Sequence, residues 1–241
     1  MVLPVREVRR ATTRGRIVTL DLLGRPFPFV AGQAVELGTT DQPIRKPYSI
    51  ACSPAQAVRS GVLEFLVRYD DDRGVSPHLL DVAPGREIAV SGPAGDFTWP
   101  STPREAHVLF VAGGTGIAPL RSMIWQALGE GYRGRVVLVH SARQEADLAW
   151  DGEFAALAQG GRITLRTFVT RGSTRVPGRW LGRIDRDRLA ELVTSRETPC
   201  FVCGPASLLD EVPAMLRDLG VIGELIRVAN WRDVPRLTAG Q

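Results

Sequence analysis

The chain has 241 residues, of which 44% are hydrophobic and 23% charged, a composition typical of folded globular proteins and unlike that of disordered or fibrous ones. At roughly 100–150 residues per domain, this length accommodates about two domains and no third. Its 30 basic and 26 acidic residues leave a net charge of +4, too small and too scattered to indicate nucleic-acid binding. An acidic protein partner, or simply a solvated arginine-rich surface, is compatible with this charge. Lys46 is the single lysine.

Membrane spans, secretion and metal sites are also not expected. The longest apolar runs, such as 108–112 and 136–139, are far shorter than the roughly 20 residues that cross a bilayer. Arg6 lies where a signal peptide would carry its apolar core, which predicts a cytoplasmic protein. The three cysteines are Cys52, Cys200 and Cys203. They are too few for a disulfide framework, for a zinc site without further ligands, or for a four-thiolate iron–sulfur cluster.

The first hundred residues alternate short apolar and polar segments with turn residues, a pattern typical of strands in an antiparallel β-barrel. The six expected strands cover 2–8, 16–22, 34–37, 47–52, 62–69 and 87–90. One short helix is expected over 76–82, because Ser76 followed by proline resembles a helix N-cap. Prolines and small polar residues at 98–103 indicate a linker. We therefore predict a first domain over 1–100 and a second over 104–241.

Beyond the linker, continuous apolar strands alternate with amphipathic helices. Strands are expected over 108–112, 136–140, 163–169, 201–203 and 225–228, and helices over 120–128, 152–159, 186–193 and 207–219. This rhythm predicts a doubly wound α/β domain, Rossmann-like, with five parallel strands covered on both faces. Ligands of such sheets bind beyond the carboxyl ends of the strands, so the chemistry is expected in the loops that follow them.

A glycine-rich turn leaves the first of these strands and enters a helix. It contains Gly113, Gly114, Thr115, Gly116 and Pro119. Glycines allow a pyrophosphate to approach the backbone closely, and a helix N-terminus offers N–H groups to it. The turn departs from G-x-G-x-x-G because Pro119 occupies the third glycine position, and the acidic residue expected about 20 residues later is missing. It indicates a dinucleotide site, with a tight turn that binds no ligand as the alternative.

A second glycine turn, Cys203-Gly204-Pro205, follows the fourth strand at the same edge of the sheet. Two such turns on adjacent strands suit the two ends of one dinucleotide, whereas Cys203 alone reads as a small buried hydrophobe. Polar and basic residues follow the strands between them, namely Ser141, Arg143, Thr170, Arg171, Arg175 and Arg179. Guanidinium groups there suit the phosphate monoester that separates NADPH from NADH, and ordinary surface arginines are the alternative.

In the barrel half, two cations, an aromatic ring and a hydroxyl lie within five residues at the start of one expected strand. These residues are Arg45, Lys46, Pro47, Tyr48 and Ser49. Because alternate residues of a strand share a face, Lys46 and Tyr48 project to one side and the others to the opposite side. The stretch offers phosphate cations and a stacking surface to a flat cofactor. The segment 74–76 offers an anion site before the expected short helix, and solvated loops are the alternative for both.

In this order, the segments 46–49, 74–76, 113–119 and 203–205 resemble the motifs of the ferredoxin–NADP reductase superfamily of flavin-dependent reductases. The resemblance extends from residue 34 to residue 231. It implies a barrel that binds FAD and an α/β domain that binds NADPH or NADH. Most of the catalysis would then come from the orientation of the two rings rather than from a strong acid or base.

The resemblance also implies roles for individual residues. Tyr48 should lie against the flavin, and Ser49 should donate a hydrogen bond near the hydride-accepting nitrogen. Thr115 and Cys203 should lie beside the nicotinamide, which makes Ser49 and Cys203 the expected catalytic residues. The remaining cofactor-binding residues implied are Val67 and Arg68 at the flavin edge, Gly74, Val75 and Ser76 at the FAD pyrophosphate, Gly113 and Gly114 under the dinucleotide pyrophosphate, and Trp231 near the C-terminus.

The chain departs from the family pattern at three positions. Lys46 stands where the family has an arginine, with Arg45 one residue earlier. Ala229 replaces a frequent glutamate two residues before the C-terminal aromatic residue. The chain also continues past Trp231, whereas members in which this aromatic caps the flavin often end on it.

The function implied is an FAD-dependent NAD(P)H oxidoreductase that passes electrons to a separate protein, such as a ferredoxin, a flavodoxin or an oxygenase component. Two alternatives stay open: an NAD(P)H:flavin reductase that uses free flavin as its substrate, and an electron-transfer subunit of a larger complex. The arginines after the second and third strands of the α/β domain favour NADPH over NADH.

Overall fold

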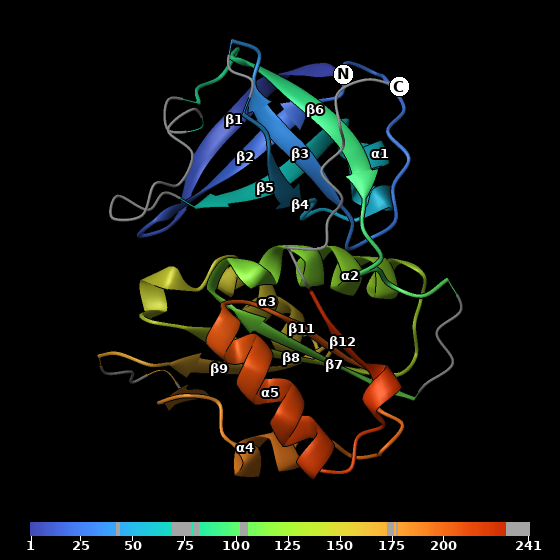
Figure 1. The fold of residues 1–241 in the computed structure, drawn as a ribbon, viewed down its shortest axis with the longest axis vertical. Helices are drawn as coiled ribbons and strands as arrows, with labels where there is room; N and C mark the ends of the chain where they lie inside the picture. Colours follow the sequence, from blue (N-terminus) through green and yellow to red (C-terminus); the bar gives the residue numbers. More distant parts are fainter. Residues whose placement is uncertain are drawn as a thin grey trace. The chain divides into compact units, whose positions relative to one another are not determined.

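The computed structural model describes residues 1–41, 44–68, 79, 82–101, 106–172, 176 and 178–229. These residues form two compact units, shown as ribbons in Figure 1. The first contains Met1–Trp99 together with Arg121–Gly129, and the second contains Pro100–Leu120 and Glu130–Ala229. The expected short helix over 76–82 and the segment 74–76 lie outside the described residues, apart from Leu79 and Val82.

The first unit is the expected antiparallel barrel. Its strands are β1 (Val2–Thr12), β2 (Gly15–Asp21), β3 (Ala34–Thr39), β4 (Lys46–Ser49), β5 (Val62–Arg68) and β6 (Glu87–Ala94). They form one sheet in the order β4-β3-β6-β1-β2-β5, in which every neighbouring pair is antiparallel. A bridge between Ile50 and Phe65 links the two edges, and Ala51 N donates to Glu64 O at 2.7 Å. The sheet is thereby closed around a core that includes Leu20, Leu63 and Phe65.

The barrel also carries a helix that we did not expect, α1 (Pro54–Ser60). Its start is a capping box: Ser53 Oγ accepts from Gln56 N at 3.2 Å, and Gln56 Oε1 accepts from Ser53 N at 2.9 Å. Proline at the first helical position and Gly61 in the left-handed conformation complete the two ends. The helix has seven residues and buries only Ala57, which is why it carries no amphipathic pattern.

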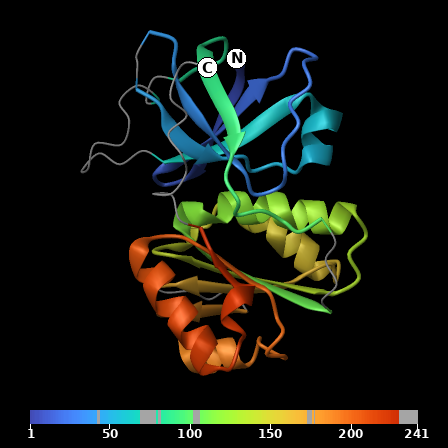
Figure 2. The same ribbon diagram turned by 45° about the vertical axis from the view of Figure 1, so that its right-hand side comes forward.

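The second unit is a parallel sheet with helices. Its strands are β7 (His107–Gly113), β8 (Arg135–Ala142), β9 (Thr164–Val169), β10 (Arg179–Leu181), β11 (Cys200–Cys203) and β12 (Ile226–Val228), in the order β10-β9-β8-β7-β11-β12. Its helices are α3 (Asp151–Gln159), α4 (Arg186–Ala190) and α5 (Ala206–Asp218), whereas α2 (Ile117–Gly129) begins in this unit and belongs to the first unit from Arg121 onward. Figure 2 shows α3 on one face of this sheet and α4 and α5 on the other. The chain reverses its winding direction between β7 and β11, so this is the switch point at which such sheets bind ligands.

The expectation of five parallel strands was wrong by one strand. The sixth is β10, which pairs in parallel with β9 through Arg179, Trp180 and Leu181. It is a three-residue edge strand between Gly178 and Gly182, and its side chains are only partly buried or exposed. An edge strand of this length shows no apolar run in the sequence.

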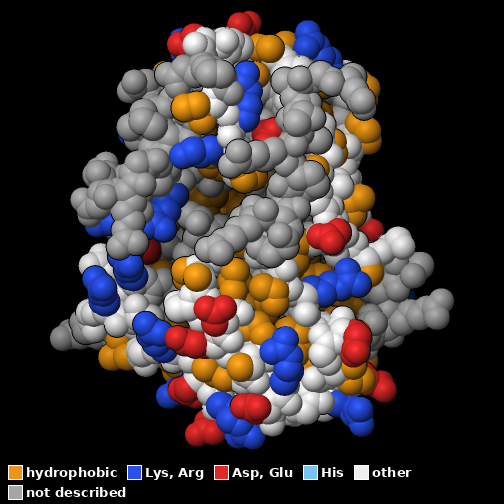
Figure 3. All heavy atoms as spheres, in the orientation of Figure 1, with side chains coloured by type: hydrophobic (Ala, Val, Ile, Leu, Met, Phe, Trp, Pro, Cys, Tyr) orange, Lys and Arg blue, Asp and Glu red, His pale blue; other side chains and the backbone are white. Residues whose placement is uncertain are grey.

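Among the residues described, no helix combines the length and the apolar character that a bilayer crossing requires. On the face drawn in Figure 3, basic and acidic side chains are intermixed over the lower part of the picture rather than gathered into a patch of one sign.

Candidate functional site

Strand β4 presents the expected flavin residues on a firmly paired support. Tyr48 lies opposite Val35 and Ser49 opposite Ala34 in the ladder with β3. The Tyr48 ring is half-buried and packs against the barrel core. Ser49 is 5% exposed, and its Oγ is buried without a hydrogen-bond partner among the described residues. Buried hydroxyls are normally paired, so this atom fits the polar edge of a bound group such as FAD.

Two cations are neighbours in the chain where β4 begins. Arg45 Nη1 donates to Thr39 O at 3.1 Å and to Ile44 O at 3.2 Å, and the side chain lies against Gly38. The Arg45 guanidinium is therefore engaged by the end of strand β3. Lys46 begins β4 opposite Leu37 and is half-buried.

The segment after Ser49 is held by two buried side chains of α2 that the sequence did not single out. Arg121 Nη1 donates to Ala51 O at 2.9 Å, and Ser122 Oγ donates to Cys52 O at 2.7 Å. Arg121 also forms a buried ion pair with Glu64, at 3.2 Å. All of these residues belong to the barrel unit. The one sequence signal for this contact was a charged residue inside an otherwise apolar helix.

Burial also makes the cysteine of this segment unreactive. It raises the pKa of the Cys52 thiol to about 11, and that of Cys200 in strand β11 to about 12. Both thiols are therefore protonated near neutral pH, and neither is a nucleophile there.

The structure brings the two glycine turns into contact. Strands β7 and β11 are neighbours, with Ala112 opposite Cys203. A Cβ built on Gly116 would lie 2.2 Å from Cys203 O, and one built on Gly113 would lie 2.6 Å from Pro205 Cδ. A Cβ on Gly204 would lie 3.0 Å from the Gly113 backbone. These three glycines are therefore required by the packing of one turn on the other.

Gly114 differs from these three glycines. Its φ of +53° is left-handed, and a Cβ there would meet no described residue within 4 Å. It begins the 3₁₀ turn Gly114–Gly116 that leads into α2, and its Cβ direction is open. Thr115, next to it, is half-buried, whereas Pro119 and Cys203 are buried. An open glycine at a helix N-terminus fits an approaching pyrophosphate.

Beneath this turn lies a histidine to which we assigned no role from the sequence. His140, near the end of β8, is 1% exposed, and its Nε2 lies 3.3 Å from Gly114 O. Burial lowers its pKa to about 4, so the ring is neutral near pH 7. A carbonyl oxygen can only accept, so Nε2 carries the proton and donates.

The basic residues beyond β8 and β9 separate into two groups. Thr170 N donates to Ala142 O at 3.0 Å, and Arg171 N donates to Arg143 O at 2.8 Å. These bonds bring the backbones of the exposed residues Arg143 and Arg171 next to each other. Ser141 is half-buried. In contrast, Arg179 is 13% exposed and forms ion pairs with Glu145 and Asp151. Its charge is therefore neutralised by protein carboxylates, which contradicts its reading as a phosphate ligand.

The remaining expected site residues either lie at the end of β5 or fall outside the described residues. Val67 is 2% exposed and lies opposite Arg16, while Arg68 is exposed and lies opposite Gly15. Gly74, Val75, Ser76, Arg175 and Trp231 lie outside the described residues. Ala229 is buried, and its N–H donates to Val202 O at 2.9 Å.

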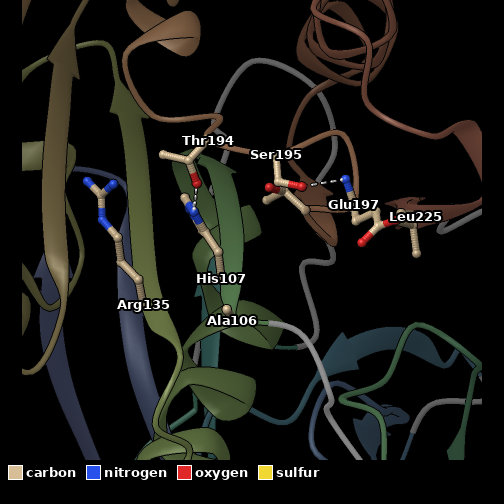
Figure 4. A pocket seen from close by; sticks show the side chains of 8 residues that line it. Ala106, His107, Arg135, Thr194, Ser195, Glu197 and Leu225 are labelled. Carbon is tan, nitrogen blue, oxygen red and sulfur yellow. Dashed lines mark hydrogen bonds between the residues drawn. The ribbon is translucent and has the colours of Figure 1, made fainter.

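A cavity of about 670 Å³ lies at the opposite, amino-terminal end of strands β7 and β8 (Figure 4). It is lined by His107, Arg135, Thr194 and neighbouring residues, none of which we expected in a nucleotide site. His107 Nδ1 and Thr194 Oγ1 are 2.6 Å apart, and burial together with the Arg135 charge lowers the pKa of His107.

Comparison with known proteins matches both units. Residues 6–99 match the family described as the oxidoreductase FAD-binding domain, and residues 110–213 match the oxidoreductase NAD-binding domain. The chain is 33% identical to ferredoxin–NADP reductase B of Sorangium cellulosum over 205 residues, which cover 81% of this chain and 80% of that protein. It is 30% identical to an NADPH oxidoreductase of Mycobacterium tuberculosis over 209 residues, 84% of this chain and 52% of that protein. The chain thus spans about half the length of this second relative.

Among solved structures, the fold is similar to that of the cytochrome P450 reductase GcoB of Amycolatopsis. The TM-score is 0.83 at 27% sequence identity, over 96% of this chain and 70% of that chain. Three findings lead to one conclusion: the barrel is followed by a doubly wound sheet, both units match domain families, and most of the chain is similar to a ferredoxin–NADP reductase. The chain belongs to the ferredoxin–NADP reductase superfamily and is an FAD- and NAD(P)-binding oxidoreductase.

Proposed function

We propose that this protein oxidises NAD(P)H at bound FAD and passes the electrons to a separate acceptor protein, such as a ferredoxin, a flavodoxin or an oxygenase component. The observation that carries the proposal is the Ser49 Oγ on β4, a buried hydroxyl without a hydrogen-bond partner among the described residues, which a flavin edge would pair. Relatives named as a ferredoxin–NADP reductase and as a cytochrome P450 reductase support an acceptor that is itself a protein.

In the barrel, β4 supplies the residues that hold the flavin. Tyr48 offers its half-buried ring as a stacking surface, and Ser49 offers its hydroxyl as a donor. Arg45 or Lys46 would supply the cation for the FAD pyrophosphate, and Lys46 stands at the position where the family has an arginine. Lysine would serve there as a point charge rather than as a bidentate ligand. Val67 and Arg68 would line the flavin edge, and Gly74, Val75 and Ser76 would bind its pyrophosphate.

In the second unit, the glycine turns hold the dinucleotide. Gly114, whose Cβ direction is open, and the start of α2 receive the pyrophosphate, while Gly113, Gly116 and Gly204 keep the two turns packed together. Thr115 and Cys203 flank the nicotinamide, where Cys203 is a small, buried neighbour that leaves room for the ring. Bound FAD supplies the redox chemistry itself, and the protein orients the donor ring toward it.

The coenzyme proposed is NADPH, selected by the exposed guanidinium groups of Arg143 and Arg171 together with Ser141 and Thr170. A phosphate monoester on the ribose forms charge-assisted hydrogen bonds with such groups, and NADH lacks it. Arg179 is not part of this selection because Glu145 and Asp151 neutralise it.

The experiment that tests the proposal begins with the purified protein. We expect a yellow protein that retains FAD through gel filtration and is bleached by NADPH under anaerobic conditions. Adding an oxidised ferredoxin or flavodoxin should restore the yellow colour with matching reduction of the carrier. A colourless protein whose NADPH oxidation saturates with added riboflavin would instead show a reductase of free flavin. Co-purification with a second oxidoreductase in fixed stoichiometry, without turnover alone, would show a subunit of a larger complex.

A further inference from the structure

A buried histidine next to the dinucleotide turn has no part in the proposed chemistry. His140 lies on β8 opposite Ala112 of β7, one residue before the pair formed by Gly113 and Ser141. It is 1% exposed, so it contacts neither solvent nor an acceptor protein. A polar ring buried to this extent requires a hydrogen-bonded partner, and the partner is the glycine turn itself.

The hydrogen bond has a defined direction. His140 Nε2 is 3.3 Å from Gly114 O, and the carbonyl can only accept, so the ring is the Nε2–H tautomer. The backbone N–H of Ile117 also donates to Gly114 O at the start of α2. The Gly114 carbonyl is thus held from the helix and from the sheet at the same time.

Fixing this carbonyl also fixes the next N–H. In a trans peptide unit, the C=O of one residue and the N–H of the following residue point in opposite directions. The Gly114 carbonyl is directed at the buried His140 ring, so the Thr115 N–H is directed away from it. Without the ring, the Gly114 carbonyl keeps only the Ile117 N–H and is held less firmly, because glycine tolerates both signs of φ and no described residue lies within 4 Å of the Cβ direction of Gly114.

We propose that His140 is a positioning residue: by donating Nε2–H to the Gly114 carbonyl, it presents the Thr115 N–H to the pyrophosphate of NADPH or NADH. This inference rests on the proposed placement of the pyrophosphate on the Gly113–Gly116 turn. In this role, His140 strengthens the binding of the dinucleotide and does not change the rate of hydride transfer. The low pKa of the ring agrees with this role, because a neutral imidazole donates a single proton and adds no charge beneath the turn.

The test compares His140→Phe, which keeps a planar ring without a donor, with His140→Gln, which keeps an N–H donor. Binding of ADP-ribose, which carries the pyrophosphate but no nicotinamide, is measured by calorimetry on the flavin-loaded protein. We expect His140→Phe to raise the Kd about five- to tenfold, the effect of one lost hydrogen bond. The KM for the coenzyme should rise to a similar degree, while the rate of flavin reduction at saturation stays within about twofold. His140→Gln should recover most of the affinity.

A matched control separates positioning from stability. His107→Phe removes a second buried histidine of the same sheet, which contacts Thr194 at the amino-terminal end of β7. It should lower the Tm without changing ADP-ribose binding. Unchanged binding in a folded His140→Phe variant, equal losses in the Phe and Gln variants, or an equal loss in His107→Phe would each overturn the inference.

Two further results complete the test. If His140→Phe does not fold, NMR of the native protein decides: ADP-ribose should shift the Thr115 amide resonance, and an unmoved resonance contradicts the inference. If the native protein does not bind ADP-ribose at all, the placement of the dinucleotide fails, and the inference that depends on it fails with it. Binding that is present but insensitive to His140 overturns the inference alone.

Discussion

Replacing Gly116 by alanine tests whether the two dinucleotide turns depend on direct backbone contact. A Cβ at this position would lie 2.2 Å from the carbonyl oxygen of Cys203, 2.5 Å from its carbonyl carbon and 2.7 Å from Gly204 N. All three are backbone atoms, and β11 is fixed to β7 by the ladder that pairs Ala112 with Cys203. The new methyl group can be accommodated only if one turn moves. Overpacking of this kind typically costs about 1–3 kcal/mol.

For a protein of this length, 1 kcal/mol corresponds to about 2–4 °C in Tm, so we expect Gly116→Ala to lower the Tm by about 2–12 °C. Circular dichroism with saturating FAD measures this shift, and calorimetry should show weaker ADP-ribose binding. Gly129→Ala is the matched control, because Gly129 ends the same helix and its Cβ would come within 4 Å of no atom in the described part of the chain. The Tm of that variant should not fall. A Gly116→Ala protein with native Tm and native binding would refute the packing argument.

Three further predictions concern charge and protonation. Arg171→Ala should raise the KM for NADPH about tenfold and leave the KM for NADH within twofold. Arg186 is an exposed arginine of α4, and Arg186→Ala should change neither KM. Equal effects of Arg171→Ala on both coenzymes would remove the basis for NADPH selection. Arg121→Met should destabilise the barrel by about 3 kcal/mol and weaken FAD retention, because Glu64 and the Ala51 carbonyl each lose the Arg121 guanidinium as a partner. Combining Arg121→Met with Glu64→Gln should recover part of the lost Tm. An Arg121→Met variant with native Tm and native FAD retention would contradict this prediction. The folded pKa of His140, about 4 against 6.5 for the free side chain, means that the unfolded chain binds more protons between these values, so native stability should fall as the pH falls from 6.5 to 4. His140→Phe should flatten this dependence in denaturation series, and an unchanged slope would show that His140 is not buried as a neutral ring.

The two-domain plan and most strands could be predicted from the sequence because each is encoded locally. Alternation marks the barrel strands, and continuous apolar runs such as 136–139 mark the buried parallel strands. The short strand β10 and helix α1 carry no such run, although the capping pair Ser53 and Gln56 was a readable signal for the helix. Contacts between residues that are far apart in the sequence cannot be predicted from local patterns of this kind.

The candidate site shows the same division. Glycine turns and the stretch from Lys46 to Ser49 were recognisable as motifs, but their supports were not. Arg121 holds Ala51 from 70 residues away in the sequence, and His140 reaches Gly114 from 26 residues away. Arg179 looked like a phosphate ligand until the structure placed Glu145 and Asp151 beside it. A charge near a strand end predicts a binding role only when no protein carboxylate neutralises it.

An anaerobic titration of the purified protein with NADPH, followed by an oxidised carrier protein, tests most directly whether bound FAD passes electrons from NADPH to a separate protein. We expect the protein to retain about one FAD per chain, to lose its flavin absorbance with one equivalent of NADPH, and to recover it as the carrier is reduced. A protein that retains no FAD, or whose bound flavin is not reduced by NADPH, would refute the proposed function.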